Sequence, residues 1–307
     1  MQPLRGIILK LCSVLLFITM AALIKATAAH VPPGEAVFFR SFFAMPVIFV
    51  WLWMRGDLRT GLRVASPMGH FWRGFVGTAA MGLMFAGLGM LPLPEVTAIG
   101  YAAPMLVVVF AAMFLGEDVR VFRLFAVALG LVGVLVVLAP RLTLLSGPEV
   151  ESMAALGAML VLMGAVCAAL AQIYVRKLVQ TEQTSAIVFF FSLTSSGLAL
   201  LTLPFGWVVP SPQEAALLVA AGVLGGLGQI FLTSAYRFAD ASVVAPFDYA
   251  SMLFAILIGY FFFDEVPTMQ MLIGAGLVIL AGVMIIWREH ALGLKREKAR
   301  SGMTPQG

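Results

Sequence analysis

Two charged side chains lie deep inside apolar runs of this sequence, where charges are rare. Asp248 and Arg40 are each about seven residues, or roughly 10 Å of helix, from the nearer end of their run. A charge at that depth in hydrocarbon is costly and predicts a functional role. Asp248 can take up a proton, attract a substrate ammonium or bond a neighbouring helix. Arg40 can hold a substrate carboxylate, cap helix ends or extend its charge to the surface.

Two tyrosines and two glutamines in the apolar runs are predicted substrate-binding residues. Tyr101 and Tyr249 can stack on an aromatic substrate above and below a cavity, or can pack with the hydroxyl bonded to a neighbouring helix. Gln229 and Gln172 can bind the polar end of an amino acid without burying a charge. They can equally hold helices together.

Methionines and prolines complete the predicted binding surface. Met81, Met84 and Met105 have flexible, polarisable side chains that suit varied apolar ligands, although any one of them is also ordinary core filler. Pro104 and Pro246 each interrupt an apolar run. A proline inside a helix frees a carbonyl group and gives a kink or a point of bending.

Three further charged residues are expected to have structural roles. Lys25 lies near the end of the first apolar run and is expected to extend its ammonium to the surface. Glu117 and Glu265 end corresponding apolar runs, and each is expected to cap the helix that follows it.

The composition predicts an all-α membrane protein. Hydrophobic residues make up 62% of the 307 residues and charged residues 11%, which is too little charge to cover a soluble domain of this size. The apolar runs are about 20 residues long, enough to span ~30 Å of hydrocarbon, and they lack the alternation of β-barrel strands. No phosphate-binding loop, zinc-ligand spacing or nucleophile triad appears in the sequence. We therefore predict no enzyme activity, cofactor, metal site or nucleic-acid partner.

Loop charges orient the predicted spans. Every second loop is rich in Lys and Arg, whereas the intervening loops contain only Arg141. Because basic loops face the cytoplasm, both termini are predicted to be cytoplasmic, in a multi-pass protein of the inner membrane surrounded by the lipid bilayer. The ten predicted spans are residues 6–28, 35–54, 70–91, 95–115, 121–139, 153–177, 184–204, 213–236, 241–263 and 269–288.

The ten spans divide into two related halves. At a constant spacing of 148 residues, Tyr101 corresponds to Tyr249 and Gly74 to Gly222. Because each half has an odd number of spans, the second half enters the membrane from the opposite side, which predicts two inverted five-helix repeats with a substrate site between them. Such a repeat is compatible with a functional monomer. The first repeat is assigned to residues 5–140, the second to 150–290, and a basic cytoplasmic tail without fixed structure to 291–307.

The repeat also bears on proton coupling. The residue that corresponds to Asp248 in the first half is Gly100, so the sequence supplies no second carboxylate beside it. Coupling through Asp248 alone and a purely facilitated mechanism both remain open.

The order of these features resembles the drug/metabolite transporter superfamily with paired EamA domains. The fourth span of one half ends in LGE (Leu115 to Glu117) and that of the other in DE (Asp264 and Glu265), and the resemblance covers about residues 5–290. The chain is most similar to bacterial exporters of aromatic and other neutral amino acids. The resemblance implies a cavity between the third, fourth, eighth and ninth spans and export of a small-molecule substrate by alternating access. Importers of riboflavin or S-adenosylmethionine share the pattern and remain an alternative, as does a receptor or scaffold that binds without transport.

Overall fold

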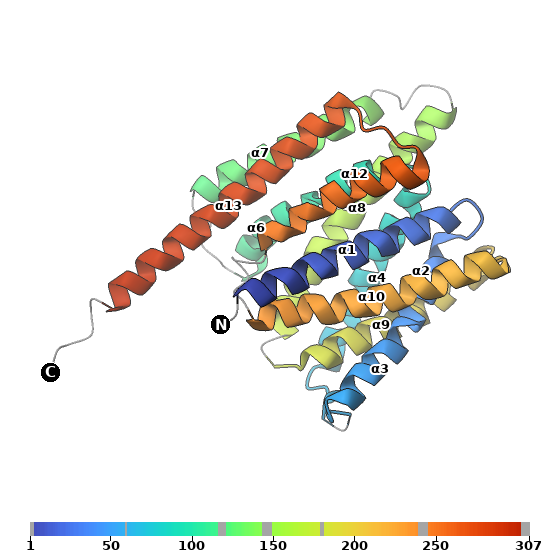
Figure 1. The fold of residues 1–307 in the computed structure, drawn as a ribbon, viewed down its shortest axis with the longest axis horizontal. Helices are drawn as coiled ribbons and strands as arrows, with labels where there is room; N and C mark the ends of the chain where they lie inside the picture. The colour runs from blue at the N-terminus through green and yellow to red at the C-terminus, as the bar shows by residue number, and fades with distance from the viewer. Residues whose placement is uncertain are drawn as a thin grey trace.

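The computed structural model is a bundle of helices (Figure 1) and describes residues 3–58, 60–115, 121–142, 149–178, 181–238 and 245–301. All regular structure in these ranges is α- or 3-10 helix. Each of the ten predicted spans coincides with a helix or with two consecutive helical segments. The helices are α1 (Pro3–Thr27), α2 (Pro33–Phe42), α3 (Ala44–Met54), α4 (Pro67–Leu88), α5 (Leu93–Gly100), α6 (Ala102–Leu115), α7 (Val121–Leu142), α8 (Glu149–Leu178), α9 (Thr184–Leu200), η1 (Leu203–Phe205), α10 (Pro212–Phe238), η2 (Ala245–Tyr249), α12 (Ala250–Phe263) and α13 (Met269–Ser301).

Apolar helices of two lengths make up the described bundle. Five segments are long and apolar enough to cross a membrane, namely Leu4–Thr27, Pro33–Met54, Pro67–Leu88, Ser152–Val175 and Pro212–Leu232. Shorter apolar segments are Leu93–Val107, Leu124–Pro140, Ser185–Leu200, Phe247–Phe263 and Met269–Met284. The count of ten crossings and the cytoplasmic position of both termini stay predictions.

One predicted span is interrupted near its middle. α2 ends at Phe42 and α3 begins at Ala44, so Phe43 lies between them. Pro46 explains the break, because it has no N–H to donate to the carbonyl of Phe42 four residues earlier. The second predicted span therefore consists of two consecutive short helices.

Three long-range helix pairs organise the bundle, and they have a common pattern. α1 packs along α10, α4 packs along α8, and α7 packs along α13. In the predicted repeat, α1 corresponds to α8, α10 to α4 and α7 to α13. The α1–α10 pair therefore corresponds to the α8–α4 pair, and the α7–α13 pair corresponds to itself. Figure 1 shows α7 and α13 side by side at one edge of the bundle, with α13 extending beyond it toward the C-terminus.

Glycines allow two of these elements to approach closely, again in matched positions. A Cβ on Gly74 of α4 would lie 2.6 Å from the side chain of Thr194 on α9. A Cβ on Gly222 of α10 would lie 2.5 Å from the Cβ of Phe43, between α2 and α3. Three residues later in each helix, Gly77 lies against Phe191, and Gly225 lies against Met20 and Arg40. Small residues of this sort take the place of the hydrophobic drive that is missing in lipid.

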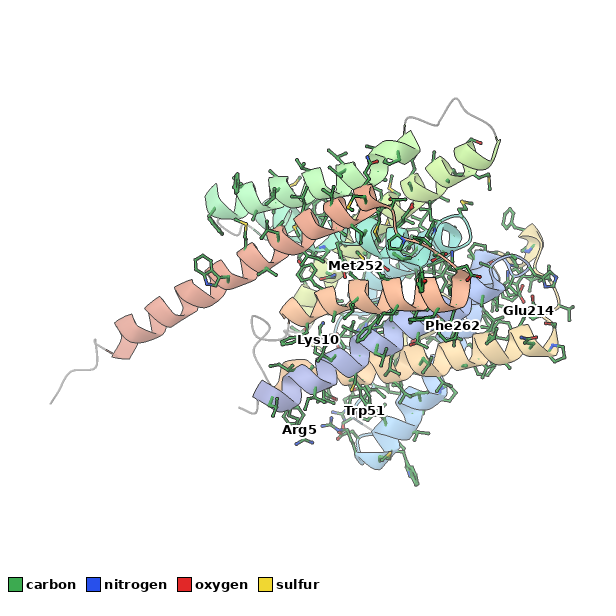
Figure 2. The ribbon with its side chains drawn as sticks, turned by 45° about the horizontal axis from the view of Figure 1, so that its top comes forward. Arg5, Lys10, Trp51, Glu214, Met252 and Phe262 are labelled. Atoms are coloured by element: carbon green, nitrogen blue, oxygen red, sulfur yellow. The ribbon has the colours of Figure 1, made fainter. Side chains whose placement is uncertain are left out.

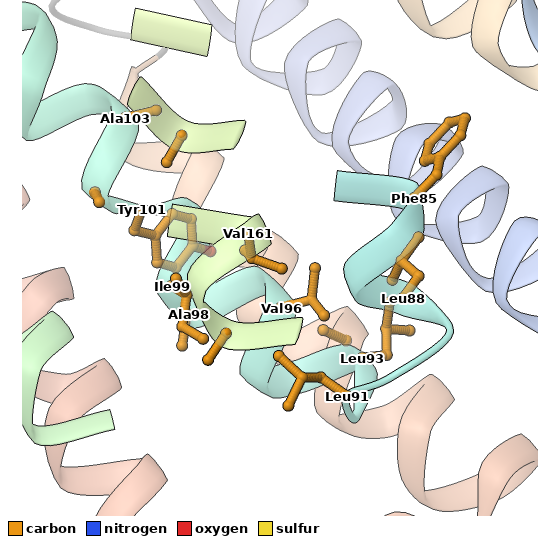
Figure 3. Close-up of a cluster of buried hydrophobic side chains, with 14 of the residues drawn as sticks. Phe85, Leu88, Leu91, Leu93, Val96, Ala98, Ile99, Tyr101, Ala103 and Val161 are labelled. Atoms are coloured by element: carbon orange, nitrogen blue, oxygen red, sulfur yellow. The ribbon is translucent and has the colours of Figure 1, made fainter. Parts of the chain in front are cut away.

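A continuous apolar core runs through the centre of the bundle, and Figure 3 shows part of it around α5. Val96 and Ile99 of α5 pack with Val161 of α8 and with Leu88 at the end of α4. Ile99 and Ala98 are fully buried. α5 is therefore held on several sides, and it fixes the position of Tyr101 at its C-terminal end.

A carboxylate joins two loops at one end of the bundle. Glu182, between α8 and α9, accepts the backbone N–H groups of Ala65 and Ser66 at 2.8 and 2.6 Å. The Nε2 atom of His70 lies 3.5 Å from the same carboxylate. The segment before α4 is thereby tied to the segment before α9.

The C-terminal segment differs from the prediction. The tail was expected to lack fixed structure from residue 291, but α13 continues as a helix to Ser301. Residues 302–307 and Glu117 lie outside the described part of the chain.

Replacing Gly222 with alanine tests the close approach of α10 to α2. The new methyl group would meet Phe43 at 2.5 Å, so we expect Gly222→Ala to lower the free energy of unfolding by about 1–3 kcal/mol through overpacking. Gly197→Ala in α9 is the matched control, because a Cβ there meets nothing within 4 Å. Thermal unfolding of the purified protein in detergent measures both, and equal melting temperatures for the two variants would contradict the close contact.

Acid unfolding tests the hydrogen bonds between Glu182 and the segment before α4. Burial raises the pKa of the Glu182 carboxyl, but the N–H donors of Ser66 and Ala65 and the contact with His70 outweigh it and hold this pKa below its usual 4.5. The stabilisation is therefore complete above pH 4.5 and is lost as the pH falls through the lower folded-state value. We expect Glu182→Gln to remove this acid-dependent loss while lowering the melting temperature at neutral pH. A variant that kept the wild-type acid profile would contradict this role.

Candidate functional site

The candidate site lies where two helical spans are interrupted at corresponding positions. α5 ends at Gly100 and α6 begins at Ala102, while α12 begins at Ala250 directly after η2. α6 and α12 are each 14 residues long. Pro104, in the first turn of α6, has no N–H for the carbonyl of Gly100, which explains the break in the first half. Pro246 lies within η2, where the structure describes its backbone and not its side chain.

The two predicted tyrosines meet at these interruptions. The rings of Tyr101 and Tyr249 lie edge to face, with centroids 5.2 Å apart and an interplanar angle of 65°. The Tyr101 hydroxyl hydrogen-bonds to the Ser251 hydroxyl and lies 3.4 Å from the main-chain carbonyl of Asp248. Ser251 donates to the same carbonyl at 2.7 Å. In this conformation the rings pack on each other instead of flanking a cavity, and their role in binding stays a prediction.

Tyr249 also determines how closely α13 approaches η2. Its hydroxyl lies against Gly282 of α13, where any Cβ would collide with it. Only glycine fits at this position while the Tyr249 ring holds its present orientation, so the ring links η2 to α13.

An ion pair completes the group. The Lys10 ammonium on α1 lies 2.7 Å from the Asp248 carboxylate, and its side chain is 2% exposed against 48% for Asp248. Figure 2 labels Lys10 on α1, which packs against η2 and α12. The sequence offered no partner for Asp248, and the structure supplies a basic one from the other half of the chain. This contact agrees with one of the roles considered for Asp248, a bond to a neighbouring helix.

This arrangement can accommodate a molecule that carries both charges. The Lys10 ammonium can bind the carboxylate of a zwitterion, and the Asp248 carboxylate can bind its ammonium. The exposed side of Asp248 is the open side of the pair, whereas Lys10 is enclosed by protein. Within hydrocarbon such a pair is stable only because each charge satisfies the other.

The predicted methionines lie around the same core. Met105 is fully buried, and its sulfur lies against Gly130 of α7. Met81 and Met84 are partly buried beside the core cluster. The Met84 methyl group is the atom nearest to a Cβ on Gly100, so Met84 reaches the break between α5 and α6.

The remaining predicted residues are more dispersed. Gln229 is partly buried on α10, Gln172 is exposed on α8, and Pro104 is exposed on α6. Arg40 is 3% exposed, so it does not extend to the surface as one interpretation allowed. Among the described contacts, none joins Arg40 to the group around Asp248.

A second ion pair closes the far end of the same elements. The Lys25 ammonium lies 2.9 Å from Glu265 and donates to the carbonyls of Leu88 and Leu91. Glu265 in turn accepts the N–H of Leu93 at 2.8 Å. Lys25 was expected to extend to the surface and Glu265 to cap its own next helix. Both expectations are wrong, because the two residues pair with each other and Glu265 caps α5 in the other half.

Sequence reasoning missed Lys10 and Arg73 as candidates. Lys10 was not singled out from the sequence, although it lies seven residues inside α1 (Pro3–Thr27). Its depth in the apolar run was the signal that could have identified it. Arg73 lies inside α4, and the same reasoning applies to it.

A double-mutant cycle tests the Lys25–Glu265 pair. Lys25→Met leaves a partly buried carboxylate and two carbonyls without their donor, so we expect a loss of about 3 kcal/mol. Adding Glu265→Gln should recover part of it, giving a coupling free energy of about 1–3 kcal/mol. Lys177→Met, at an exposed lysine on α8, should change stability little. Strictly additive losses in chemical unfolding would rule out the pairing.

Comparisons with known proteins agree with this architecture. The model of the EamA-like transporter family matches residues 4–139 and 155–287. A pseudopaline exporter of Pseudomonas aeruginosa is 31% identical over 284 residues, covering 91% of this chain and 95% of the relative. An S-adenosylmethionine uptake transporter of Rickettsia felis is 28% identical over 264 residues, covering 86% of each chain.

A solved crystal structure shares the fold. It superposes with a TM-score of 0.66, covers 94% of this chain and 98% of its own, and is 21% identical. The family match spans most of the sequence, and the named relatives are transporters rather than enzymes. The chain therefore belongs to the EamA-like transporter family and is a multi-pass membrane transporter, not an enzyme.

Proposed function

We propose that the protein exports neutral, mainly aromatic and other hydrophobic amino acids and related amino-acid derivatives across the inner membrane by alternating access. The observation that carries this proposal is the ion pair of Lys10 and Asp248 beside the hydroxyl of Tyr101. The ammonium of an amino acid can replace Lys10 beside Asp248, and its carboxylate can replace Asp248 beside Lys10. Tyr249, Met105 and Met84 supply apolar surface for its side chain, with Gln229 and Gln172 as further polar groups.

The contact pattern supports two inverted halves of five spans, residues 5–140 and 150–290. Helix pairs and glycine contacts recur when the halves are exchanged, as an inverted repeat requires. Such repeats provide the two exchanged conformations that alternating access needs. The basic loops favour cytoplasmic termini with the tail 291–307 on that side, and the intrachain repeat favours a monomer.

Two ion pairs on one helix support a rocking movement. Lys10 and Lys25 lie toward opposite ends of α1, and their partners Asp248 and Glu265 belong to η2 and to the turn after α12. When α1 tilts against η2 and α12, one pair opens while the other stays closed. A zwitterion that replaces the Lys10–Asp248 contact stabilises the state in which that pair is open.

A second candidate function is uptake of an S-adenosylmethionine-like metabolite. It is favoured by the similarity to S-adenosylmethionine uptake transporters, while the similarity to an exporter favours the opposite direction. S-adenosylmethionine is itself an amino-acid derivative, so the same ion pair suits its amino-acid portion. The transported compound and the direction of net flux separate the two candidates.

Uptake into proteoliposomes tests the proposal. With a panel of labelled phenylalanine, leucine, methionine and S-adenosylmethionine, with and without a proton gradient, we expect saturable flux of the neutral amino acids. Lys10→Met and Asp248→Asn should each reduce flux at least about ten-fold, since each loses a charged hydrogen bond to the substrate. Lys177→Met should retain it.

Four other outcomes are informative. Flux of S-adenosylmethionine alone would establish the second candidate, and flux unaffected by both charge variants would show that the ion pair is not the substrate site. A requirement for the proton gradient that disappears in Asp248→Asn would assign proton coupling to Asp248. No flux of any compound would remove the whole substrate class.

A further inference from the structure

The buried polar atoms without a hydrogen-bond partner gather in one region of the described bundle. They are Nε of Arg40, Oγ of Ser41, Nδ1 of His70, and Nε and Nη1 of Arg73, whereas Nε2 of His70 lies 3.5 Å from the Glu182 carboxylate. All four residues belong to α2 and α4, which pack against each other and against α9. Buried polar atoms are normally paired, so such a concentration calls for an explanation.

Two of these residues are arginines that share one aromatic ring. The guanidinium carbon of Arg73 lies 3.6 Å from the ring centroid of Phe191 on α9, and that of Arg40 lies 5.6 Å from it. Arg40 also packs against Gly225 of α10, and Arg73 against Gly77 of α4. Two like charges are therefore held close to each other at the junction of α2, α4, α9 and α10.

The protein does not balance these charges with carboxylates from the surrounding helices. α2, α4, α9 and α10 together contain only Glu35 and Glu214. Glu35 accepts the backbone N–H of Val208, and Glu214 is occupied by His30 and Ser211. The ring face of Phe191 attracts both cations. This attraction offsets only a small part of the desolvation free energy that a buried charge costs.

We propose that Arg40 and Arg73 form a binding site for a carboxylate ligand, with Phe191 as its floor. A guanidinium group presents a planar fork of donors that fits a carboxylate with two parallel hydrogen bonds. The unpaired Nε of Arg40 and the unpaired Nε and Nη1 of Arg73 are the donors left for it. This site is distinct from the Lys10–Asp248 pair, and it stands independently of the proposed transport substrate.

The position of the site explains how it can open. Arg40 is 3% exposed and closed off, whereas Arg73 is only partly buried. The site lies between the second and third spans of one half, α2 and α4, and the second and third spans of the other, α9 and α10, so relative movement of the halves changes access to it. A carboxylate bound there would neutralise two charges and stabilise the conformation that holds it.

Thermal unfolding in lipid nanodiscs tests the site with succinate as the probe and chloride at equal ionic strength as the reference. We expect succinate to raise the melting temperature of the wild-type protein by about 3 °C or more. Arg40→Gln and Arg73→Gln should weaken the apparent affinity at least about ten-fold, while Arg63→Gln, at an exposed loop arginine, should retain it. Arg40→Lys keeps the charge without the planar fork and should give an intermediate affinity.

Stability in chloride alone provides an independent readout. Because Arg40 is a buried charge without a carboxylate, Arg40→Gln should be at least as stable as the wild type there. A clear loss of stability in chloride would show that Arg40 is satisfied by the protein, and it would overturn the proposal. The absence of a succinate-specific shift, or a shift that persists in both glutamine variants, would also overturn it. Equal stabilisation by phosphate and none by succinate would reject the carboxylate class.

Discussion

The lack of water around the helices is the constraint on which this structure depends. A charge or a free backbone group inside a membrane must find its partner within the protein. Lys25 meets this requirement with one carboxylate and two helix-end carbonyls, and Glu265 with that ammonium and the N–H of Leu93. The ends of α4, α5 and α12 are therefore fastened to α1 by a single connected group of polar atoms. In water the same contacts would compete with solvent and would contribute far less to stability.

The same constraint explains where the helices can be interrupted. A break in the middle of a span exposes carbonyl groups, and a neighbouring donor has to cover them. At η2 the carbonyl of Asp248 accepts Ser251 and lies within reach of the Tyr101 hydroxyl. The interruption in one half is thus closed by a side chain from the interruption in the other. The two breaks therefore depend on each other for their hydrogen bonds.

The two charged regions of the bundle differ in a way that matters for transport. The Lys10–Asp248 pair is internally neutral and open on one side. Arg40 and Arg73 have only an aromatic ring against their charges. A neutral pair can exchange one partner for a zwitterion with little change in net charge, whereas an uncompensated cation pair gains most from an anion. The close glycine contacts of α4 and α10 bring the second of these regions together, since larger residues at those positions would hold the helices apart.

The sequence by itself determined the class of protein and the positions of the apolar helices. These follow from the length of apolar runs and the placement of prolines, which are properties of the chain read locally. It also identified Asp248 and Arg40 as unusual, because depth in an apolar run can be counted. It could not identify Lys10 as the partner of Asp248, Lys25 as the partner of Glu265, or Phe191 as the ring beneath Arg40 and Arg73. Only the tertiary structure decided these pairings, because each joins helices from opposite halves of the chain, and no local pattern records which side chains meet when those helices pack.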